Sequence, residues 1–310
     1  MDIMHPKAAI GTNAWGGRIY GGLIRGDYVE DEVIGQMIEE SVKLDIPLFD
    51  LARDYGFGKA QKMMGRLGNK DTLISAKYTP FTHYRKGCVR KSLEKDLQDF
   101  GRSFVDIYWL HLPTDLKDHL VEIAELYKEG KIRYVGVSNF DLEECKRSKE
   151  ILEAHGIPLY GVQNHYSIIC REWETNGLLK WCRENNILFW GWAVLEEGLL
   201  VDPSSMRRSV MKSIYNGRVK KLSGLYDVMG QIATRRNVKI PMIAIAYCAA
   251  KGVVPVVGCR KPSRVRELSE SVSLELTPEE IERLESAADA SNVKIMGADI
   301  FRPFVLKERR

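Results

Sequence analysis

Short apolar runs alternate with longer amphipathic segments along the whole chain. The apolar runs predict strands at 8–11, 47–51, 72–77, 104–111, 133–138, 159–164, 187–193 and 253–257. Between them, apolar residues recur at helical intervals, which predicts helices at 31–45, 57–68, 87–100, 116–130, 141–155, 174–186, 225–238 and 263–270. Eight strand-then-helix units favour a (β/α)8 TIM barrel.

A doubly wound open sheet is the main alternative fold. It normally carries a Gly-x-Gly-x-x-Gly turn after its first strand, where a helix begins. The nearest glycine-rich stretch, 16–22, opens no clear helix, so the barrel is favoured. No linker interrupts the pattern, and we expect one barrel domain over residues 1–310.

Helix ends and two irregular segments complete the predicted layout. Asp31, Asp141 and Ser263 are candidate N-caps, and a further helix begins with the capping-box pattern Thr277-Pro278-Glu279-Glu280. The connection 196–224 after the seventh strand is too long for an ordinary loop, and loops of this length are often functional. We expect it to be a flap over a ligand, and the tail 291–310 to cover one end of the barrel.

Polar residues stand where three successive apolar runs end. Asp50, Lys77 and His111 close the second, third and fourth predicted strands, and Tyr55 follows Asp50 in the next loop. The carboxyl ends of barrel strands open on one face, so these four side chains are expected to converge there.

This combination suits proton transfer. A free tyrosine has a pKa of about 10, but a nearby lysine ammonium favours the phenolate and lowers that pKa by about 1–3. Asp50 would keep Lys77 charged and oriented, and His111 would steer the substrate oxygen. Tyr55 would then be a general acid that protonates a developing alkoxide.

Each of these residues alone has a structural explanation. A single Asp or Lys at a strand end is more often a cap or an ion pair, and a single His in an aromatic run is more often a core residue. Their joint occurrence favours catalysis. One other function stays open: a (β/α)8 lyase that forms a Schiff base on Lys77.

The chain resembles the aldo-keto reductases over nearly its whole length. The resemblance is carried by Asp-x-Ala-x-x-Tyr-Gly at 50–56, Lys77, Arg90-x-Ser92-Leu93, Asp106-x-Tyr108-x-x-His111, Gly136-Val137-Ser138-Asn139-Phe140, Gln163 and Val257-Gly258-Cys259-Arg260. It implies a (β/α)8 barrel without a metal, which uses NADPH to reduce aldehydes and ketones. A non-catalytic NADPH-binding regulatory subunit, a role that some members of this family have taken, stays open as an alternative. It also implies that Tyr55 is the general acid, with Asp50, Lys77 and His111 as its partners.

The resemblance further implies where the dinucleotide binds. The nicotinamide contacts map onto Ser138, Asn139 and Gln163, with Trp192 as the stacking aromatic, although Trp190 and Trp192 could both be core residues. Gly11 and Thr12 match the first-strand turn beneath the cofactor. The adenosine-phosphate site maps onto Gly258, Cys259, Arg260, Arg264 and Glu267, at the opening of a helix.

Two positions depart from the family pattern. The family often has Ser-Pro-Leu and small residues after its stacking aromatic, whereas this chain has Ala193-Val194-Leu195-Glu196-Glu197-Gly198. The resemblance still implies that Leu195 lies against the pyrophosphate. Glu196 and Glu197 would repel a pyrophosphate unless they face solvent or pair with cations such as Lys220 and Lys221. Leu268 replaces an Asn that commonly faces the adenine.

The substrate is expected to be a small carbonyl compound of hydrophobic or aromatic character. Loops at the strand ends would supply an apolar lining of Trp15, Tyr20, Tyr78, Phe81, Leu112 and Phe301.

Composition and charge disfavour several other binding partners and cofactors. The net charge of +4 is mild and its basic residues are dispersed, which disfavours nucleic-acid binding. No apolar run is long enough to cross a bilayer, and the N-terminus lacks a signal-peptide core, so no membrane partner is expected. The six cysteines occur singly, which favours a reduced cytoplasmic protein without structural zinc.

Overall fold

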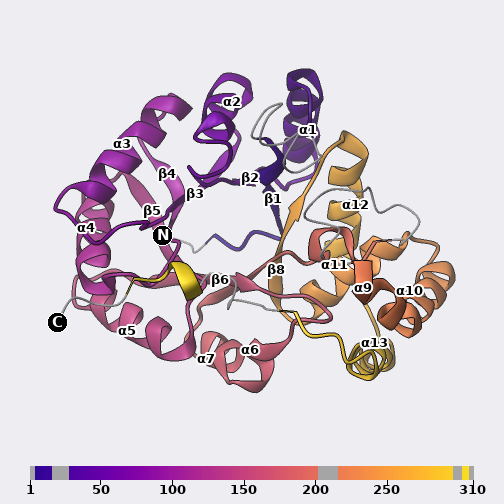
Figure 1. The fold of residues 1–310 in the computed structure, drawn as a ribbon. Coiled ribbons are helices and arrows are strands. Elements are labelled where there is room, and N and C mark those ends of the chain that lie inside the picture. The colour runs from indigo at the N-terminus through magenta and orange to yellow at the C-terminus, as the bar shows by residue number, and fades with distance from the viewer. Residues whose placement is uncertain (1–3, 16–27, 202–215, 296–301, 307–310) are drawn as a thin grey trace.

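Eight parallel strands form a closed barrel in the computed structural model, which describes residues 4–15, 28–201, 216–295 and 302–306 (Figure 1). The strands are β1 (Ala9–Gly11), β2 (Leu48–Asp50), β3 (Leu73–Tyr78), β4 (Val105–Leu110), β5 (Ile132–Ser138), β6 (Leu159–His165), β7 (Leu188–Trp192) and β8 (Val253–Gly258). Each strand pairs with the next, and β8 closes on β1 with Gly258 opposite Gly11. The predicted TIM barrel is confirmed, and the open sheet is excluded.

Helices surround the barrel on its outside (Figure 1). In the described part of the chain they are α1 (Asp31–Lys43), α2 (Lys59–Leu67), α3 (Cys88–Phe100), α4 (Leu116–Lys128), α5 (Leu142–Glu153), α6 (Glu172–Thr175), α7 (Leu178–Glu184), α9 (Asn216–Val219), α10 (Ser223–Arg236), α11 (Ile240–Ala250), α12 (Pro262–Val272) and α13 (Pro278–Ala290). The helix expected at 174–186 is two, α6 and α7. Helix α11 was not predicted, because it is apolar on nearly all sides and buried from Pro241 to Cys248, so it shows no polar face.

The helix caps follow the prediction in part. Asp141 and Thr277 each complete a capping box with a glutamate three residues on, as expected. The predictions for Asp31 and Ser263 were wrong. Asp31 is already the first residue of α1, whose N-cap is Glu30, and α12 begins at Pro262, because proline suits a first helical position.

Side chains alternate between the barrel interior and the layer of helices. The interior is filled by a separate apolar cluster, which consists of Ala9, Leu48, Ile107, Trp109, Tyr160, Trp190, Val254 and Val256. Trp109 and Trp190 meet edge to face with ring centroids 5.4 Å apart. The alternate residues of the same strands pack outward against the helices in the larger core. This alternation decides which residues at the strand ends can reach the mouth of the barrel.

The two irregular segments are described only in part. After β7 the chain forms a short 3-10 turn, Glu196–Gly198, and it resumes with α9 at Asn216, while 202–215 lie outside the described residues. In the tail, the turn Arg302–Phe304 is followed by Leu306, whose backbone N–H donates to Thr114 Oγ1 over 3.1 Å. The described part of the tail thus reaches the loop after β4, on the carboxyl side of the barrel, and its covering of that end stays a prediction.

The tight packing of the barrel interior allows a prediction of how one added methyl group changes the stability of the protein. A Cβ at Gly136 would lie 2.3 Å from the Trp109 ring, so we expect Gly136→Ala to destabilise the fold by about 1–3 kcal/mol through overpacking. Gly35 in α1 has no atom within 4 Å of such a Cβ, so Gly35→Ala is expected to stabilise by about 0.5–1 kcal/mol. Urea unfolding of both variants measures this. Equal stability of the two variants would contradict the packing.

Candidate active site

The ends of β2, β3 and β4 bring three polar side chains together inside the barrel. Asp50 ends β2 beside Ser75 of β3, and Lys77 of β3 lies beside Trp109 of β4. His111 follows β4 directly, and its backbone N–H donates to the carbonyl of Tyr78 over 2.8 Å. All three side chains are at least 93% buried, with exposures of 2% for Asp50, 1% for Lys77 and 7% for His111.

A buried ion pair forms the centre of this site. Lys77 Nζ pairs with Asp50 Oδ2. The other carboxylate oxygen, Asp50 Oδ1, accepts from Ser75 Oγ over 2.7 Å and from Gln163 Nε2 over 3.2 Å. Ser75 Oγ in turn accepts from Trp109 Nε1 over 2.7 Å. The carboxylate is therefore held on both oxygens, which a buried charge requires.

Tyr55 approaches this pair from the loop between β2 and α2. Its ring centroid lies 5.5 Å from Lys77 Nζ. The loop is tied to α3 by Arg53, whose Nε donates to Asp96 Oδ1 over 2.8 Å and whose Nη2 donates to Asp99 Oδ2 over 2.9 Å. The structure thus brings together the four residues that the sequence singled out.

His111 is held in its neutral form. Burial lowers the pKa of its imidazole to about 4, and the Lys77 charge acts in the same direction, against the opposing effect of Asp54 and Asp50. Its Nδ1 lies 2.7 Å from Thr79 Oγ1, and Thr79 Oγ1 donates to Asp54 Oδ1 over 3.2 Å. The sequence analysis did not single out Thr79, and it took Asp54, which lies near the site, as structural or substrate-facing.

The residues expected at the nicotinamide also lie together, at the ends of β5, β6 and β7. Asn139 Oδ1 accepts from Trp192 Nε1 over 3.1 Å, and Asn139 Nδ2 donates to the His111 carbonyl over 3.1 Å. Ser138 Oγ donates to the Gln163 carbonyl over 2.8 Å. These hydroxyl and amide groups fit a carboxamide, which needs both donors and acceptors. Trp190 belongs to the interior core, whereas Trp192 is only partly buried, which suits a stacking surface.

Glu196 turns inward, a geometry that the sequence did not reveal. Its side chain is 2% exposed and Oε1 bonds to His165 Nε2 over 2.9 Å and accepts from Ser167 Oγ. The His165 ring stacks on Trp192 with centroids 4.4 Å apart. Glu196 therefore neither faces solvent nor pairs with Lys220 or Lys221, the two arrangements that were expected to keep it from a pyrophosphate.

The backbone of this segment is locally strained. Ala193, Glu196 and Glu197 all have positive φ angles, of 55°, 48° and 54°. Such angles are unfavourable for residues with a Cβ, so other contacts must stabilise the turn. The buried hydrogen bonds of Glu196 are suited to that task.

Cations gather at the opening of α12, where the adenosine phosphates were expected. Arg260, Lys261 and Arg264 come from this segment, and the N-cap position makes no side-chain hydrogen bond. Glu267 pairs with Arg264 and with Lys239, whose Nζ is 2.5 Å from Glu267 Oε1. Although burial raises the pKa of Glu267, these cations lower it overall. Lys239 was missed by the sequence analysis because it stands far away along the chain, before α11.

Residues at the carboxyl ends of β1 and β8 lie beside each other in the barrel. Thr12 Oγ1 donates to the Asp50 carbonyl over 2.9 Å, and Gly11 lies beside Gly258. Cys259 is buried, and burial raises the pKa of its thiol to about 12, which disfavours the reactive thiolate. Leu195 is partly buried against the main core.

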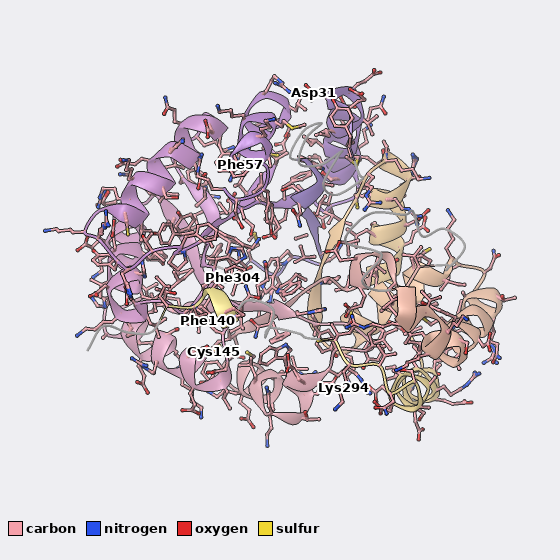
Figure 2. All side chains as sticks on the ribbon, viewed as in Figure 1. Asp31, Phe57, Phe140, Cys145, Lys294 and Phe304 are labelled. Carbon is pink, nitrogen blue, oxygen red and sulfur yellow. The ribbon has the colours of Figure 1, made fainter. Side chains whose placement is uncertain are left out.

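Only some of the residues that were expected to line the substrate pocket can be placed at the mouth of the barrel. Tyr78 alternates with Lys77 and therefore faces the helices, where its ring lies 5.3 Å from that of His119 in α4; its placement in the lining was wrong. Trp15 and Leu112 are buried, and Phe81 is 61% exposed. Tyr20 and Phe301 lie outside the described residues. Phe304, from the tail, is 56% exposed (Figure 2).

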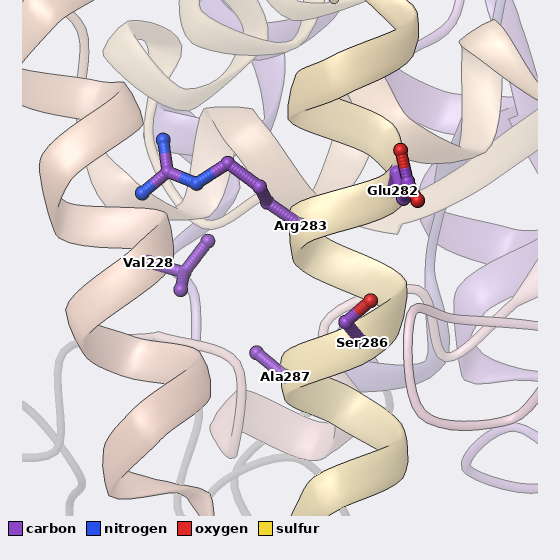
Figure 3. A pocket seen from close by; sticks show the side chains of 5 residues that line it. All are labelled: Val228, Glu282, Arg283, Ser286 and Ala287. Atoms are coloured by element: carbon purple, nitrogen blue, oxygen red, sulfur yellow. The ribbon is translucent and has the colours of Figure 1, made fainter.

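A groove on the outside of the barrel is separate from this site. A shallow groove between α10 and α13 is lined by Val228, Glu282, Arg283, Ser286 and Ala287, none of which belongs to the site (Figure 3). Among the described residues, no group of three or more His, Cys, Asp or Glu side chains could hold a metal ion. No helix within the described ranges has the length and apolarity needed to span a membrane.

Comparison with known proteins agrees with this geometry. The sequence model of the Aldo/keto reductase family matches residues 8–289. The chain is 27% identical to an aldo-keto reductase of Gibberella moniliformis, covering 78% of this chain and 79% of the relative. It is 25% identical to the NADH-specific methylglyoxal reductase of Escherichia coli, covering 93% and 96%. Among solved structures, a thermostable aldo-keto reductase in complex with epalrestat superposes with a TM-score of 0.72 at 26% identity, over 91% of this chain and 95% of that one.

The buried contacts of Glu196 predict a stability effect. Glu196→Ala leaves His165 and Ser167 without their buried partner, so we expect a loss of about 1–3 kcal/mol in urea unfolding and a changed Trp192 fluorescence. Glu275 is exposed, and Glu275→Ala is the matched control, expected within about 0.5 kcal/mol of wild type. If Glu196→Ala is as stable as this control, the pairing is not formed in solution.

Proposed function

The chain belongs to the aldo/keto reductase family and is an NAD(P)H-dependent oxidoreductase, and on that premise we propose that it reduces an aldehyde or ketone to the alcohol with Tyr55 as the proton donor. The observation that carries this proposal is the placement of the Lys77 ammonium, which is paired with Asp50 in the barrel and lies 5.5 Å from the Tyr55 ring centroid. A cation at this place favours the phenolate form of Tyr55.

The proposed step is balanced by one hydride and one proton. When bound, the reduced nicotinamide supplies the hydride to the carbonyl carbon. Tyr55 gives its hydroxyl proton to the carbonyl oxygen, which becomes the alcohol, and the remaining phenolate is stabilised by Lys77. Tyr55 then regains a proton from solvent. Since Lys77 is itself held by Asp50, its charge and position are fixed before the substrate arrives.

The same ion pair disfavours the lyase. A lysine must lose its proton before its nitrogen can attack a carbonyl, and the buried Asp50 carboxylate stabilises the ammonium. Borohydride trapping with a carbonyl substrate distinguishes the two functions, since a reductase forms no adduct. A purely regulatory NADPH-binding subunit would bind the dinucleotide without turnover, and the assembled four residues argue against it.

The dinucleotide is proposed to bind between the mouth and the opening of α12. Ser138, Asn139 and Gln163 would hold the carboxamide, and Trp192 would stack on the ring. Arg260 and Arg264 would meet phosphate, with Lys239 as an additional cation held by Glu267. This arrangement supports NADPH, although one relative of the chain is named as NADH-specific.

For the substrate we propose a hydrophobic or aromatic carbonyl compound. The exposed rings of Phe81 and Phe304, from the loop after β3 and from the tail, support this choice. We also keep the prediction of a cytoplasmic protein, because the cysteines of the described chain are all free thiols.

The role of Tyr55 predicts a selective loss of turnover. Tyr55→Phe removes the proton donor and should lower kcat by about 10²–10⁴-fold, while NADPH affinity measured by fluorescence quenching stays near wild type. Tyr127→Phe in α4 is the matched control and should leave both unchanged. Turnover of Tyr55→Phe within about fivefold of wild type would show that another group supplies the proton.

The cation cluster predicts the dinucleotide preference. Hydrogen bonds to charged groups contribute about 1.5–3 kcal/mol, so we expect Arg264→Ala to weaken NADPH binding by about ten- to a hundredfold and to change NADH binding little. Arg266 lies on the same helix but pairs with Glu40, so Arg266→Ala is the control. Titration calorimetry of the wild type and of both variants, each with NADPH and with NADH, measures these six affinities. Equal wild-type affinity for NADH and NADPH would refute the phosphate site.

A further inference from the structure

The loop that carries Tyr55 is tied to α3 by a single arginine, Arg53, which stands two residues before Tyr55. Its Nε donates to Asp96 Oδ1 over 2.8 Å, and its Nη2 donates to Asp99 Oδ2 over 2.9 Å. Nη2 also pairs with Asp96 Oδ1, so one edge of the guanidinium serves both carboxylates. Asp96 is fully buried and Asp99 is mostly buried. These ion pairs of Arg53 with Asp96 and Asp99 form the Arg53 clamp.

The same guanidinium also lies against the loop beyond Tyr55. A Cβ at Gly58 would be 2.9 Å from Arg53 Nη1, and Gly58 has a φ angle of 84°. Glycine therefore suits this position both by its backbone conformation and by the room that the guanidinium takes. The chain thus folds around the guanidinium, with Arg53 before Tyr55 and Gly58 after it.

The backbone after Tyr55 has a conformation that needs support. Gly56, Phe57 and Gly58 have consecutive positive φ angles, of 63°, 57° and 84°. For Phe57, which has a Cβ, such an angle costs about 1–3 kcal/mol. Its ring is exposed, so burial of the ring does not offset that cost (Figure 2). Strain of this kind persists only where surrounding contacts determine the loop, and the Arg53 clamp supplies such contacts.

The helix that receives the clamp is itself firmly placed. Helices α2 and α3 lie side by side (Figure 1), and a Cβ at Gly65 would be 2.0 Å from the carbonyl oxygen of Asp99. The same part of α3 packs into the main core through Leu97 and Phe100. Because α3 cannot shift without disturbing this packing, the clamp fixes the loop relative to the barrel.

We propose that Arg53, held by Asp96 and Asp99, is a positioning residue that keeps Tyr55 beside Lys77 for proton transfer. The inference rests on the proposed function, in which Tyr55 is the proton donor. Lys77 belongs to β3, whereas Tyr55 belongs to a loop, so the 5.5 Å between Lys77 Nζ and the Tyr55 ring centroid depends on how that loop is held. A loop that is fixed before the substrate arrives needs less reorganisation in the reaction, which raises kcat more than substrate affinity.

The charges of the clamp depend on one another. Burial raises the pKa of Asp96 to about 7, and Asp99 acts in the same direction, whereas Arg53 and Lys95 lower that pKa. The guanidinium therefore favours the ionised form of a carboxyl that burial alone would keep protonated. A lysine at position 53 would keep one positive charge, but it lacks the planar fork that reaches both carboxylates at once.

The test follows the ionisation of Tyr55 and the turnover of the same variants. In NMR titration of ¹³Cζ-labelled tyrosine, with Tyr55→Phe used to assign the signal, Arg53→Lys is expected to move the Tyr55 midpoint up, toward the usual pKa of about 10. We expect kcat to fall by about three- to thirtyfold, because a small misplacement of a reacting group is costly. The KM for the carbonyl and the Kd for NADPH should stay within about twofold of wild type, since Arg53 contacts neither ligand in this account.

A second variant and a control complete the design. Arg53→Gln combined with Asp96→Asn removes the fully buried charge together with its partner, so it tests the clamp even if Arg53→Lys does not fold. The same upward shift and the same fall in kcat are expected. Arg66 of α2 pairs with Asp31 at the surface, so Arg66→Lys is the matched control and should change neither measurement.

Either of two results overturns the positioning role. One is a wild-type Tyr55 midpoint and a wild-type kcat in the double variant. The other is a fall in kcat with an unchanged Tyr55 midpoint, which would show that Arg53 acts on the fold in general and not on Tyr55. If Tyr55→Phe kept full turnover while Arg53→Lys moved the Tyr55 midpoint, the proposed proton donor would fail and the clamp would stand.

Discussion

The buried pair between Lys77 and Asp50 is the interaction on which the rest of the site depends. Burying two charges is costly, and removing one partner of such a pair typically costs about 3–5 kcal/mol. The fold offsets that cost with hydrogen bonds to the second oxygen of Asp50 from Ser75 and Gln163. Ser75 is oriented by Trp109, and the Trp109 ring fits only because Gly136 lacks a side chain. The barrel core and the candidate chemistry are thus one connected arrangement.

Two buried carboxylates in the segments expected to bind the dinucleotide are also held by partners within the protein. Glu196 is buried against His165 and Ser167, and Glu267 is held by Arg264 and Lys239. Each acidic group thereby has partners within the protein, and the two cations that pair with Glu267 reduce its repulsion of a bound phosphate. The Glu196 contact also places the His165 ring against Trp192, so it supports the surface on which the nicotinamide would stack.

The barrel could be predicted from the sequence because segments with strand periodicity and segments with helix periodicity alternate regularly along it. The four candidate catalytic residues could be predicted because Asp50, Lys77 and His111 end consecutive strands and Tyr55 follows in the next loop. The sequence analysis missed α11, where a helix buried on nearly all sides has no polar face to show a period. It placed Tyr78 in the substrate lining, although alternation with Lys77 turns that ring toward the helices. Lys239 and the inward turn of Glu196 depend on contacts between residues far apart in the chain, which spacing alone does not reveal.

The central claim is that the Lys77 charge makes the Tyr55 hydroxyl more acidic. Titration of ¹³Cζ-labelled tyrosine by NMR tests it directly, with Tyr55→Phe used to assign the signal. The comparison is the wild type against the double variant Lys77→Met and Asp50→Asn, which removes both charges and leaves neither unpaired. The account predicts that Tyr55 ionises below the usual pKa of about 10 in the wild type and at or above it in the double variant. The same titration midpoint in both proteins would contradict it.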